Sequence, residues 1–533
     1  MKSNSALIIV NEYGKKTHLT APIGKLLQVF LTQNGFETES PCGGNGRCGK
    51  CRVKFLQGAP SPGSFDERFL SEKELKEGYR LLCKAVIRGN CEIEIVKPEK
   101  DMVVEEVETL AVDSSFDKTG SDRAYAIAVD LGTTTIAAAL VAKSGAETKA
   151  LRSASTVNHQ RRFGSDVISR ISEAEDPAVL KELSDIVIRD IKSLVDQLLL
   201  PEKENGKLKG SIEHIAIAGN TTMMNLLFGR DVSWLGKFPY TSPEDGLGLR
   251  TIPARDLFGD YEGTLLTAMP GISAFVGADI VSGIYYLKSQ DMELTNAMFV
   301  DLGTNGEMAY FDHGTIAVTS TAAGPVFEAG GISCGVASVP GAICHVKLKG
   351  RDEHFFATYE TIGDAPAIGL CGTGVLELVS EAVRVGLVDE TGLLSDPYFE
   401  TGFPLTGDDK IILSQQDVRN MQLGKAAIRT GAATLLSGKV PDNVYLAGGF
   451  GTHIHMDNVK NLRMFPEEFD GKIISVGNTS LKGAMSFAMK ALTGSDALNG
   501  AEKELKYIVQ SASVINLATL DEFDEKYIEA MNF

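Results

Sequence analysis

Long hydrophobic runs are missing from this sequence, and none approaches the ~20 apolar residues needed to cross a bilayer. The first residues, MKSNSALIIVNEYGKK, contain an apolar core of only five residues, ALIIV. A secretory signal needs a longer apolar core, of about 7–15 residues. We therefore expect neither export nor membrane insertion, and we expect a cytoplasmic protein.

Basic residues are also in short supply, with 52 Lys and Arg against 70 Asp and Glu and a net charge of −18. An acidic surface repels nucleic-acid backbones and anionic lipids, so we expect neither nucleic acid nor membrane as a partner. The 43% hydrophobic and 23% charged content is that of a globular protein, which excludes disordered and fibrous classes. A length of 533 residues is enough for about three to four domains.

Cysteine is scarce, but the few cysteines are clustered. Four of the eight follow the spacing Cys42-x5-Cys48-x2-Cys51, with Cys83 in a distant segment. A large cytoplasmic chain has little use for disulfides, so clustered cysteines indicate metal or redox chemistry. Three close cysteines and one remote cysteine are typical of plant-type [2Fe–2S] sites, here with one residue inserted in the first spacing.

The loop around the first three cysteines, PCGGNGRCGKC, is rich in glycine, which lets backbone N–H groups approach cluster sulfur atoms closely. Zinc is the rival metal, but zinc ribbons usually have two C-x2-C pairs and this chain has one. The sequence therefore predicts a [2Fe–2S] cluster held by Cys42, Cys48, Cys51 and Cys83. Cys91 lies beyond the motif in an expected strand and is interpreted as a packed thiol.

The expected secondary structure and the charge differ between three segments of the chain. Residues 1–97 combine expected strands at 7–10, 52–55 and 91–96 with an expected helix at 23–35, which indicates a small α+β domain. Residues 98–122 are strongly acidic and are interpreted as a linker. From residue 123 onward, strands that end in Gly/Thr turns alternate with helices. We expect two subdomains here, at 123–295 and at 296–533 with a C-terminal tail.

A strand–turn–strand unit occurs twice in the second part. DLGTTT at 130–135 recurs as DLGTNGE at 301–307, 171 residues later, which indicates an internal duplication. Such a turn presents N–H groups and hydroxyls to phosphates, and its aspartate can hold Mg²⁺. Asp301 or Glu307 is then placed to orient an attacking water. The candidate residues are Asp130, Gly132, Thr133, Thr134 and Thr135 in the first turn, and Asp301, Gly303, Thr304, Asn305, Gly306 and Glu307 in the second.

Three further segments have the residue types of a nucleotide site. Gly448, Gly449 and Phe450 follow an expected strand, where glycines leave room for adenine or ribose. Gly372 and Gly374 open an expected helix whose first N–H groups are available to a ligand. Asn220, in AGNTT, is a candidate for the phosphate site.

The order of these segments resembles the superfamily of sugar kinases, heat-shock chaperones and actin: two phosphate turns, then an adenosine loop. The resemblance covers about residues 124–490. It implies two ribonuclease-H-like subdomains around an ATP cleft, preceded here by a [2Fe–2S] ferredoxin-like β-grasp domain.

A cysteine domain ahead of such an ATPase resembles the reductive activators of corrinoid proteins. Further matches are FGSDVISRI (163–171), IAGNTTMMNLLFG (217–229), STAAGPVFEAGGISCG (320–335) and LAGGFG (446–451). The resemblance implies ATP-dependent reduction of Co(II) to Co(I) in a methyltransferase system, with [2Fe–2S], ATP and Mg²⁺ as cofactors. It implies a Co(II) corrinoid protein as partner, and leaves open the electron donor and a homodimer.

Ser320 lies beyond the second phosphate turn, where we expect a loop that faces a partner. Its hydroxyl is a candidate contact for cobalt, and the alternative is a turn serine bonded to backbone. His453-x-His455 has a spacing suited to a metal on a strand, but no third ligand is evident in the sequence.

Three other functions remain open. The chain fits a small-molecule kinase with an accessory cluster, although no acceptor signature stands out. It also fits an ATP-fuelled electron donor to another low-potential enzyme, as in 2-hydroxyacyl-CoA dehydratase activation, but those activators bridge a [4Fe–4S] cluster between subunits. An actin-like scaffold is the third alternative.

Overall fold

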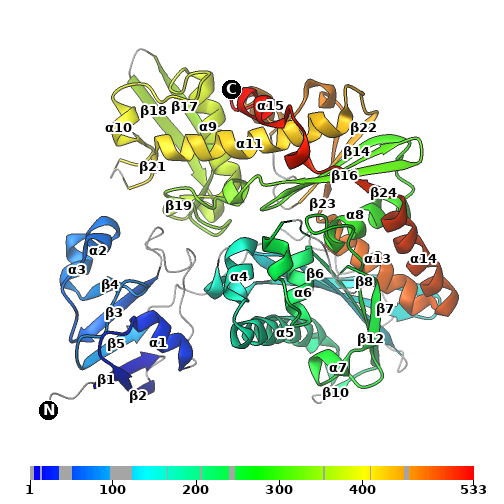
Figure 1. Cartoon of the computed structure of the whole chain (residues 1–533), viewed down its shortest axis with the longest axis horizontal. Helices are drawn as coiled ribbons and strands as arrows, with labels where there is room; N and C mark the ends of the chain where they lie inside the picture. Colours follow the sequence, from blue (N-terminus) through cyan, green and yellow to red (C-terminus); the bar gives the residue numbers. More distant parts are fainter. Residues whose placement is uncertain are drawn as a thin grey trace.

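The computed structural model describes residues 5–12, 15–34, 36, 51–95, 123–164, 166–204, 207–238, 240, 247–351, 354–407, 410–448 and 455–533. Three large sheets organise these residues, one in an N-terminal domain and one in each of two lobes (Figure 1).

The N-terminal domain has a five-stranded sheet in the order β2-β1-β5-β3-β4. The hairpin of β1 and β2 is antiparallel, while β1 and β5 are parallel, which is the mixed sheet of a β-grasp fold. Helix α1 is shorter than the expected 23–35, because Leu26 is still extended and pairs with Val86. The elements are β1 Ser5–Glu12, β2 Lys15–Pro22, α1 Leu27–Gln33, β3 Arg52–Gln57, α2 Ser64–Phe69, α3 Glu72–Lys76, β4 Tyr79–Leu81 and β5 Cys91–Ile95.

Lobe I has a six-stranded sheet in the order β12-β13-β11-β6-β7-β8. The first three strands in sequence, β6, β7 and β8, are antiparallel neighbours, and β11 and β13 add in parallel on the other side of β6. The elements are β6 Ala124–Leu131, β7 Thr135–Ser144, β8 Glu147–Val157, α4 Val167–Glu173, α5 Pro177–Leu199, β11 Ser211–Gly219, α6 Thr221–Leu227, β12 Arg250–Pro253, α7 Arg255–Phe258, β13 Leu265–Ala268 and α8 Ala278–Ser289.

Lobe II repeats that topology with β14, β15, β16, β22 and β23, and β24 adds beyond β16. The repeat confirms two ribonuclease-H-like subdomains. An insertion between β16 and β22 builds a smaller sheet with helices of its own. The elements are β14 Asn296–Leu302, β15 Gly306–Asp312, β16 Thr315–Thr321, η4 Pro325–Glu328, β17 Ala342–Arg351, β18 His354–Thr361, β19 Gly369–Leu370, α9 Gly372–Arg384, α10 Tyr398–Thr401, β20 Phe403–Pro404, β21 Ile412–Leu413, α11 Gln415–Leu436, β22 Asn443–Ala447, α12 Met456–Asn461, β23 Ile473–Gly477, α13 Thr479–Thr493, α14 Ser495–Ser511, β24 Ala512–Val514 and α15 Phe523–Glu529.

The two lobes share one hydrophobic core, in which α8 of lobe I crosses α13 of lobe II (Figure 1). A Cβ on Gly483 would lie 2.0 Å from the carbonyl oxygen of Ser282, and one on Gly283 would lie 2.7 Å from the Phe299 ring. The Ser282 hydroxyl donates to the Ser480 carbonyl at 2.7 Å. Glycine at the crossing therefore permits the close approach of the two helices.

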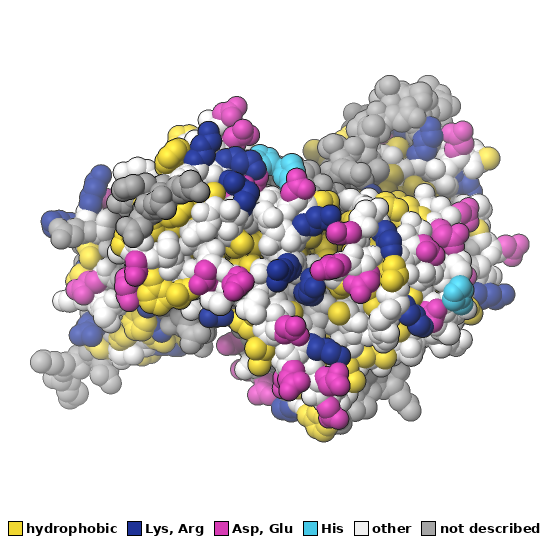
Figure 2. Space-filling model, turned by 90° about the horizontal axis from the view of Figure 1, so that it is seen from above, with side chains coloured by type: hydrophobic (Ala, Val, Ile, Leu, Met, Phe, Trp, Pro, Cys, Tyr) yellow, Lys and Arg dark blue, Asp and Glu magenta, His cyan; other side chains and the backbone are white. Residues whose placement is uncertain are grey.

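Charge on the face seen in Figure 2 is mixed, with acidic and basic side chains interspersed. Within the described ranges, no helix combines the length and apolar character needed to cross a membrane.

Candidate nucleotide cleft and cysteine site

The first phosphate turn joins β6 to β7 in lobe I. Asp130 is the penultimate residue of β6 and pairs with Ala137 across the hairpin. A Cβ on Gly132 would lie 2.5 Å from the Thr135 carbonyl oxygen, so the tight turn requires glycine there. Thr134 is exposed at the tip.

A buried arginine donates hydrogen bonds that fix the backbone of this turn. Arg170 of α4 is completely buried, and its guanidinium donates to the carbonyls of Thr133 at 2.7 Å and Gly164 at 2.9 Å. Burial lowers the pKa of Arg170 to about 10. Asn158 adds a bond from its amide to the Gly132 carbonyl at 2.9 Å. The backbone of the turn is thus fixed by side-chain donors.

Asn220 lies against the same turn, and its role at the phosphate site stays a prediction. Its Oδ1 caps α6 by accepting from the Met223 N–H at 3.0 Å, and its Nδ2 donates to the Thr133 hydroxyl at 2.9 Å.

The second phosphate turn joins β14 to β15 in lobe II. Asp301 pairs directly with Glu307, and the Gly303 N–H donates to the Asn305 carbonyl at 3.0 Å. The Asn305 amide lies 3.5 Å from Glu307 Oε1. The strand pairing places both carboxylates on one face of the sheet.

Four carboxylates lie close enough to influence one another electrostatically where the two turns meet. Burial raises the pKa of Asp301 to about 8 and that of Asp279, in the first turn of α8, to about 7. Burial also raises the pKa values of Asp130 and Glu307, and the negative charges of Asp279 and Asp301 add to the shift at Glu307. Solvent still reaches Asp130, Asp279 and Asp301, which are half-buried.

Asp130 is also tied to the opposite half of the module. Its carboxylate accepts hydrogen bonds from the Asn478 amide at 2.8 Å and the Ser480 hydroxyl at 2.6 Å. Asn478 is the N-cap of α13, so the predicted Mg²⁺ aspartate lies at the junction of the lobes.

Ser320 is the penultimate residue of β16 and does not lie in a loop. Its neighbours Val318, Thr319 and Thr321 are buried residues of the same strand. Ser320 pairs directly with Glu307 and is half-buried. The loop expected around Ser320 is therefore wrong, although the residue does lie beside a cleft carboxylate.

The predicted glycines have packing reasons of their own. A Cβ on Gly372 would lie 1.8 Å from the Phe327 carbonyl oxygen, and one on Gly306 would lie 2.2 Å from the Ile428 side chain. A Cβ on Gly374 would lie 2.1 Å from the Ile343 carbonyl oxygen.

Gly448, at φ +95°, approaches the Leu302 carbonyl and therefore lies against the second turn. Gly449 and Phe450 lie outside the described residues.

Two of the four predicted cluster cysteines lie side by side in the N-terminal domain. Cys51 precedes β3 and Cys83 follows β4; both are buried, and the Leu82 N–H donates to the Cys51 carbonyl at 2.6 Å. A hydrogen bond with the Cys83 thiol and burial raise the pKa of Cys51, so two neighbouring protonated thiols are favoured when no metal replaces their protons. This pair fits two ligands of an iron–sulfur cluster. Cys42 and Cys48 lie outside the described residues.

The other cysteine of this domain packs as expected. Cys91 lies in β5 within the hydrophobic core, and burial raises its pKa to about 11. A Cβ on Gly58 would touch it at 3.0 Å, so the thiol is enclosed.

The histidines that the structure describes do not assemble into a metal site. The His455 and His345 rings meet edge to face with centroids 5.6 Å apart, and His345 Nδ1 lies 3.1 Å from Glu377 Oε2. His453 lies outside the described residues. In the part of the chain that the structure describes, no three His, Cys, Asp or Glu side chains converge on one metal position. The cleft carboxylates therefore do not form a cation cage by themselves.

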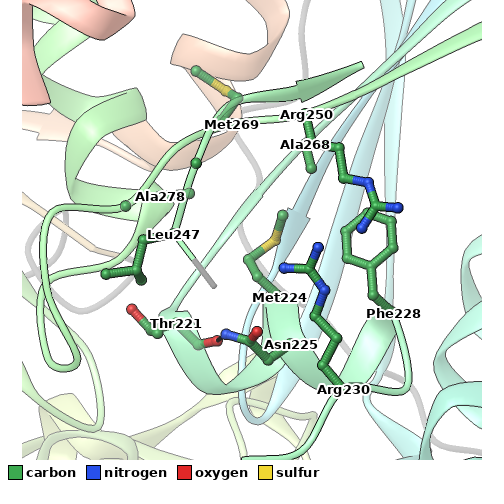
Figure 3. A pocket seen from close by; sticks show the side chains of 12 residues that line it. Thr221, Met224, Asn225, Phe228, Arg230, Leu247, Arg250, Ala268, Met269 and Ala278 are labelled. Carbon is green, nitrogen blue, oxygen red and sulfur yellow. Dashed lines mark hydrogen bonds between the residues drawn. The ribbon is translucent and has the colours of Figure 1, made fainter. Parts of the chain in front are cut away.

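A cavity of about 20 Å³ lies behind α6, lined by Met224, Phe228, Arg230, Arg250 and neighbours. Figure 3 shows the two guanidinium groups against the Phe228 ring, with centroid distances of 5.5 and 5.1 Å. A water needs about 10–15 Å³, so this cavity is too small for a nucleotide.

Sequence reasoning missed Asp279, Arg170 and Glu328. Arg170 and Glu328 lie within segments quoted for the family resemblance, FGSDVISRI and STAAGPVFEAGG, which was a usable signal. Asp279 lies in VGADIVSG at the start of α8, and this segment parallels VGNTSLKG at residues 476–483 at the start of α13.

Three family models match consecutive parts of the chain. A 2Fe-2S iron–sulfur cluster binding domain matches residues 10–88, the RACo middle region matches 125–292, and the C-terminal domain of RACo, described as the ASKHA domain, matches 295–533. The chain belongs to the RACo family. Family membership and fold class are thereby confirmed.

Relatives of this RACo-family chain have corrinoid-related names. The corrinoid activation enzyme RamQ of Eubacterium limosum is 31% identical over 397 residues, which are 68% of this chain and 64% of RamQ. The [Co(II) methylated amine-specific corrinoid protein] reductase of Methanosarcina barkeri is 26% identical over 455 residues, 77% of each chain. The alignment with RamQ thus spans less than two thirds of that protein.

A solved structure, the reductive activator for corrinoid, iron–sulfur protein, has the same fold as this chain. Its TM-score is 0.65 at 24% identity, and the match covers 99% of this chain and 98% of that one.

Proposed function

We propose that this chain is an ATP-dependent reductive activator of a corrinoid protein. One electron from a low-potential donor passes through the N-terminal domain to the partner's Co(II), giving Co(I), while ATP and water give ADP and phosphate. The observation that carries the proposal is the combination, in one RACo-family chain, of a duplicated phosphate-turn cleft with a buried cysteine pair in a ferredoxin-like domain. The names of the relatives support the same activity.

The cleft supports binding of the nucleotide as its Mg²⁺ complex. Desolvation, hydrogen bonds and the negative charges of neighbouring carboxylates shift the pKa values of four acidic residues, Asp130, Asp279, Asp301 and Glu307. A polyphosphate beside such charges requires a cation between them. Mg²⁺ usually takes one or two carboxylates together with phosphates and waters, which suits a cleft that has no complete protein cage.

Within this cleft, the two turns have different tasks. Thr133, Thr134 and Thr304 present hydroxyls to the phosphates, and Asn220 holds Thr133 in place. Glu307 is buried and has a raised pKa, so it is suited to hold a proton or orient the attacking water. Asp301 is its direct neighbour across the strand pair.

In the N-terminal domain, Cys51 and Cys83 bring two distant segments together, and Cys42 and Cys48 are proposed as the other two ligands. The bound [2Fe–2S] cluster supplies a one-electron carrier near ~−400 mV for the plant type. Ser320 is proposed as a partner-facing residue, since it lies at the cleft edge of β16.

The test uses the intact chain, a chemical reductant and a purified Co(II) corrinoid protein, and it follows the visible absorption band of Co(I). We expect Co(I) only when ATP is hydrolysed, and none with a non-hydrolysable analogue. ATP-dependent phosphorylation of a small molecule without any cobalt change would instead support a kinase.

A matched pair of cysteine variants tests the electron path. Cys83→Ser is expected to abolish both the iron–sulfur absorption and Co(I) formation while leaving ATP binding intact. Cys91→Ser, a buried thiol of the same core, is expected to retain both. Zinc at these cysteines in the purified protein would contradict the proposed electron path.

A further inference from the structure

Glu328, which has no role in the account above, touches both phosphate turns at once. Its Oε2 accepts a hydrogen bond from the Thr134 hydroxyl of lobe I at 3.1 Å and from the Thr304 hydroxyl of lobe II at 3.3 Å. Thr134 is 194 positions from Glu328 and Thr304 is 24 positions from it, so the contact with Thr134 joins lobe I to lobe II.

A carboxylate oxygen is a good mimic of a phosphate oxygen at this position. Both are anionic acceptors, and the two hydroxyls belong to the turns expected to bind phosphate. Glu328 is itself exposed, so water and ligands reach the same place. A phosphate that bound both hydroxyls would have to displace the Glu328 carboxylate.

The segment that carries Glu328 is not free to follow the side chain independently. Glu328 ends the short helix η4, whose Phe327 carbonyl lies against Gly372 at the start of α9. On the other side of η4, Gly424 of α11 approaches the Val326 side chain, where a Cβ would lie 2.5 Å away. Loss of the two hydroxyl contacts therefore removes the support that the turns give to this segment, while the two helices of lobe II continue to hold it.

We propose that Glu328 is a specificity-determining residue: its carboxylate occupies the position of the nucleotide phosphate nearest both turns, and ATP binds by replacing it. The inference rests on the proposed binding of ATP in this cleft. A ligand must then bring enough phosphate and Mg²⁺ interactions to outcompete an internal anion, and η4 loses its hydrogen bonds to both turns when it does.

The test is calorimetric titration of the intact chain with Mg²⁺ and a non-hydrolysable ATP analogue. Glu328→Ala is expected to bind the analogue about tenfold more tightly than the unmodified chain, the scale of one hydrogen bond to a charged group. Glu328→Gln keeps the side-chain volume and is expected to move in the same direction. Glu400→Ala, an exposed glutamate of α10, serves as the matched control and should change nothing.

Hydrogen exchange gives a second readout at the N–H groups of Ala329 and Gly330, which donate to carbonyls within η4. The analogue should speed their exchange in the unmodified chain, and Glu328→Ala should exchange fast without it. Equal or weaker analogue binding by both Glu328 variants would overturn the inference, because the carboxylate would then be neutral or a ligand contact. Absence of any nucleotide binding by the unmodified chain would instead refute the proposed function.

Discussion

The two phosphate turns began as copies of one unit but are now built differently. The first spans four residues between Leu131 and Ile136, while the second spans three between Leu302 and Gly306. Opposite its aspartate, the first turn has Ala137, and the second has Glu307.

Their supports differ in the same way. The first turn accepts hydrogen bonds from the buried Arg170 guanidinium and the Asn158 amide. In the second turn, Gly306 packs on Ile428, and carboxylates lie nearby. This difference fits the proposed roles, with the first turn fixed for phosphate binding and the second placed beside groups for acid–base chemistry.

The largest expected effect is at Glu307. Glu307→Gln should lower ATP turnover by about 10²–10⁴-fold, the usual contribution of a general acid or base, while binding of a non-hydrolysable analogue persists. Steady-state phosphate release and calorimetry measure the two quantities. Asp312→Asn, at the far end of β15, is the control. Loss of analogue binding in Glu307→Gln would show that the second turn also serves binding.

The next effect is at the first turn. Arg170→Met leaves the carbonyls of Thr133 and Gly164 without donors, which should cost about 1–3 kcal/mol for each. We expect a lower thermal midpoint for the ATPase module and weaker nucleotide binding, with Arg170→Lys intermediate. An unchanged midpoint would mean that the first turn does not depend on this support.

A smaller effect is expected from pH. The pKa values of Asp279 and Asp301, about 7 and about 8, lie above those of an unfolded chain, so the folded protein binds more protons. This stabilisation is present at low pH and is lost as pH rises through about 7 to 8. The thermal midpoint without Mg²⁺ should therefore fall between pH 6 and pH 8.

Mg²⁺ with an ATP analogue should reverse that trend, because the bound cation favours the ionised carboxylates. Differential scanning fluorimetry across this pH range checks both statements. Asp279→Asn should flatten the profile, and a profile unchanged in this variant would assign the pH dependence to other groups.

The smallest effects concern the two threonines. Thr134→Val and Thr304→Val each remove one exposed hydrogen bond to Glu328, and both should lower the thermal midpoint slightly and to a similar extent, by the equivalent of about 0.5–1.5 kcal/mol. A clear inequality would show that one turn holds Glu328 alone.

The turns themselves could be predicted from the sequence because each is local: an apolar strand, an aspartate, a glycine and a hydroxyl residue follow one another. The cysteine spacing is local as well, and it predicted the iron–sulfur domain that the family model at residues 10–88 confirms. The repeat predicted two copies of one unit, and the family resemblance implied that each copy has a ribonuclease-H-like fold.

The supports could not be predicted, because they depend on distant contacts. Arg170 reaches a carbonyl 37 positions away, and Asp130 reaches Asn478 across 348 positions. Strand β8 was missed because nearly all its residues are half-buried, so ETKALRSASTV lacks an alternating apolar pattern. Ser320 was expected in a loop because the small and polar residues around it are not typical of a strand.

The α8–α13 crossing has a consequence for anyone who dissects this protein. Since α13 packs on β6, β7 and β11 of the other lobe, a fragment that stops near residue 292 would expose the underside of its own sheet. Such a split product should precipitate alone and regain solubility only when co-expressed with its complement, so the two halves are inseparable parts of one folding unit.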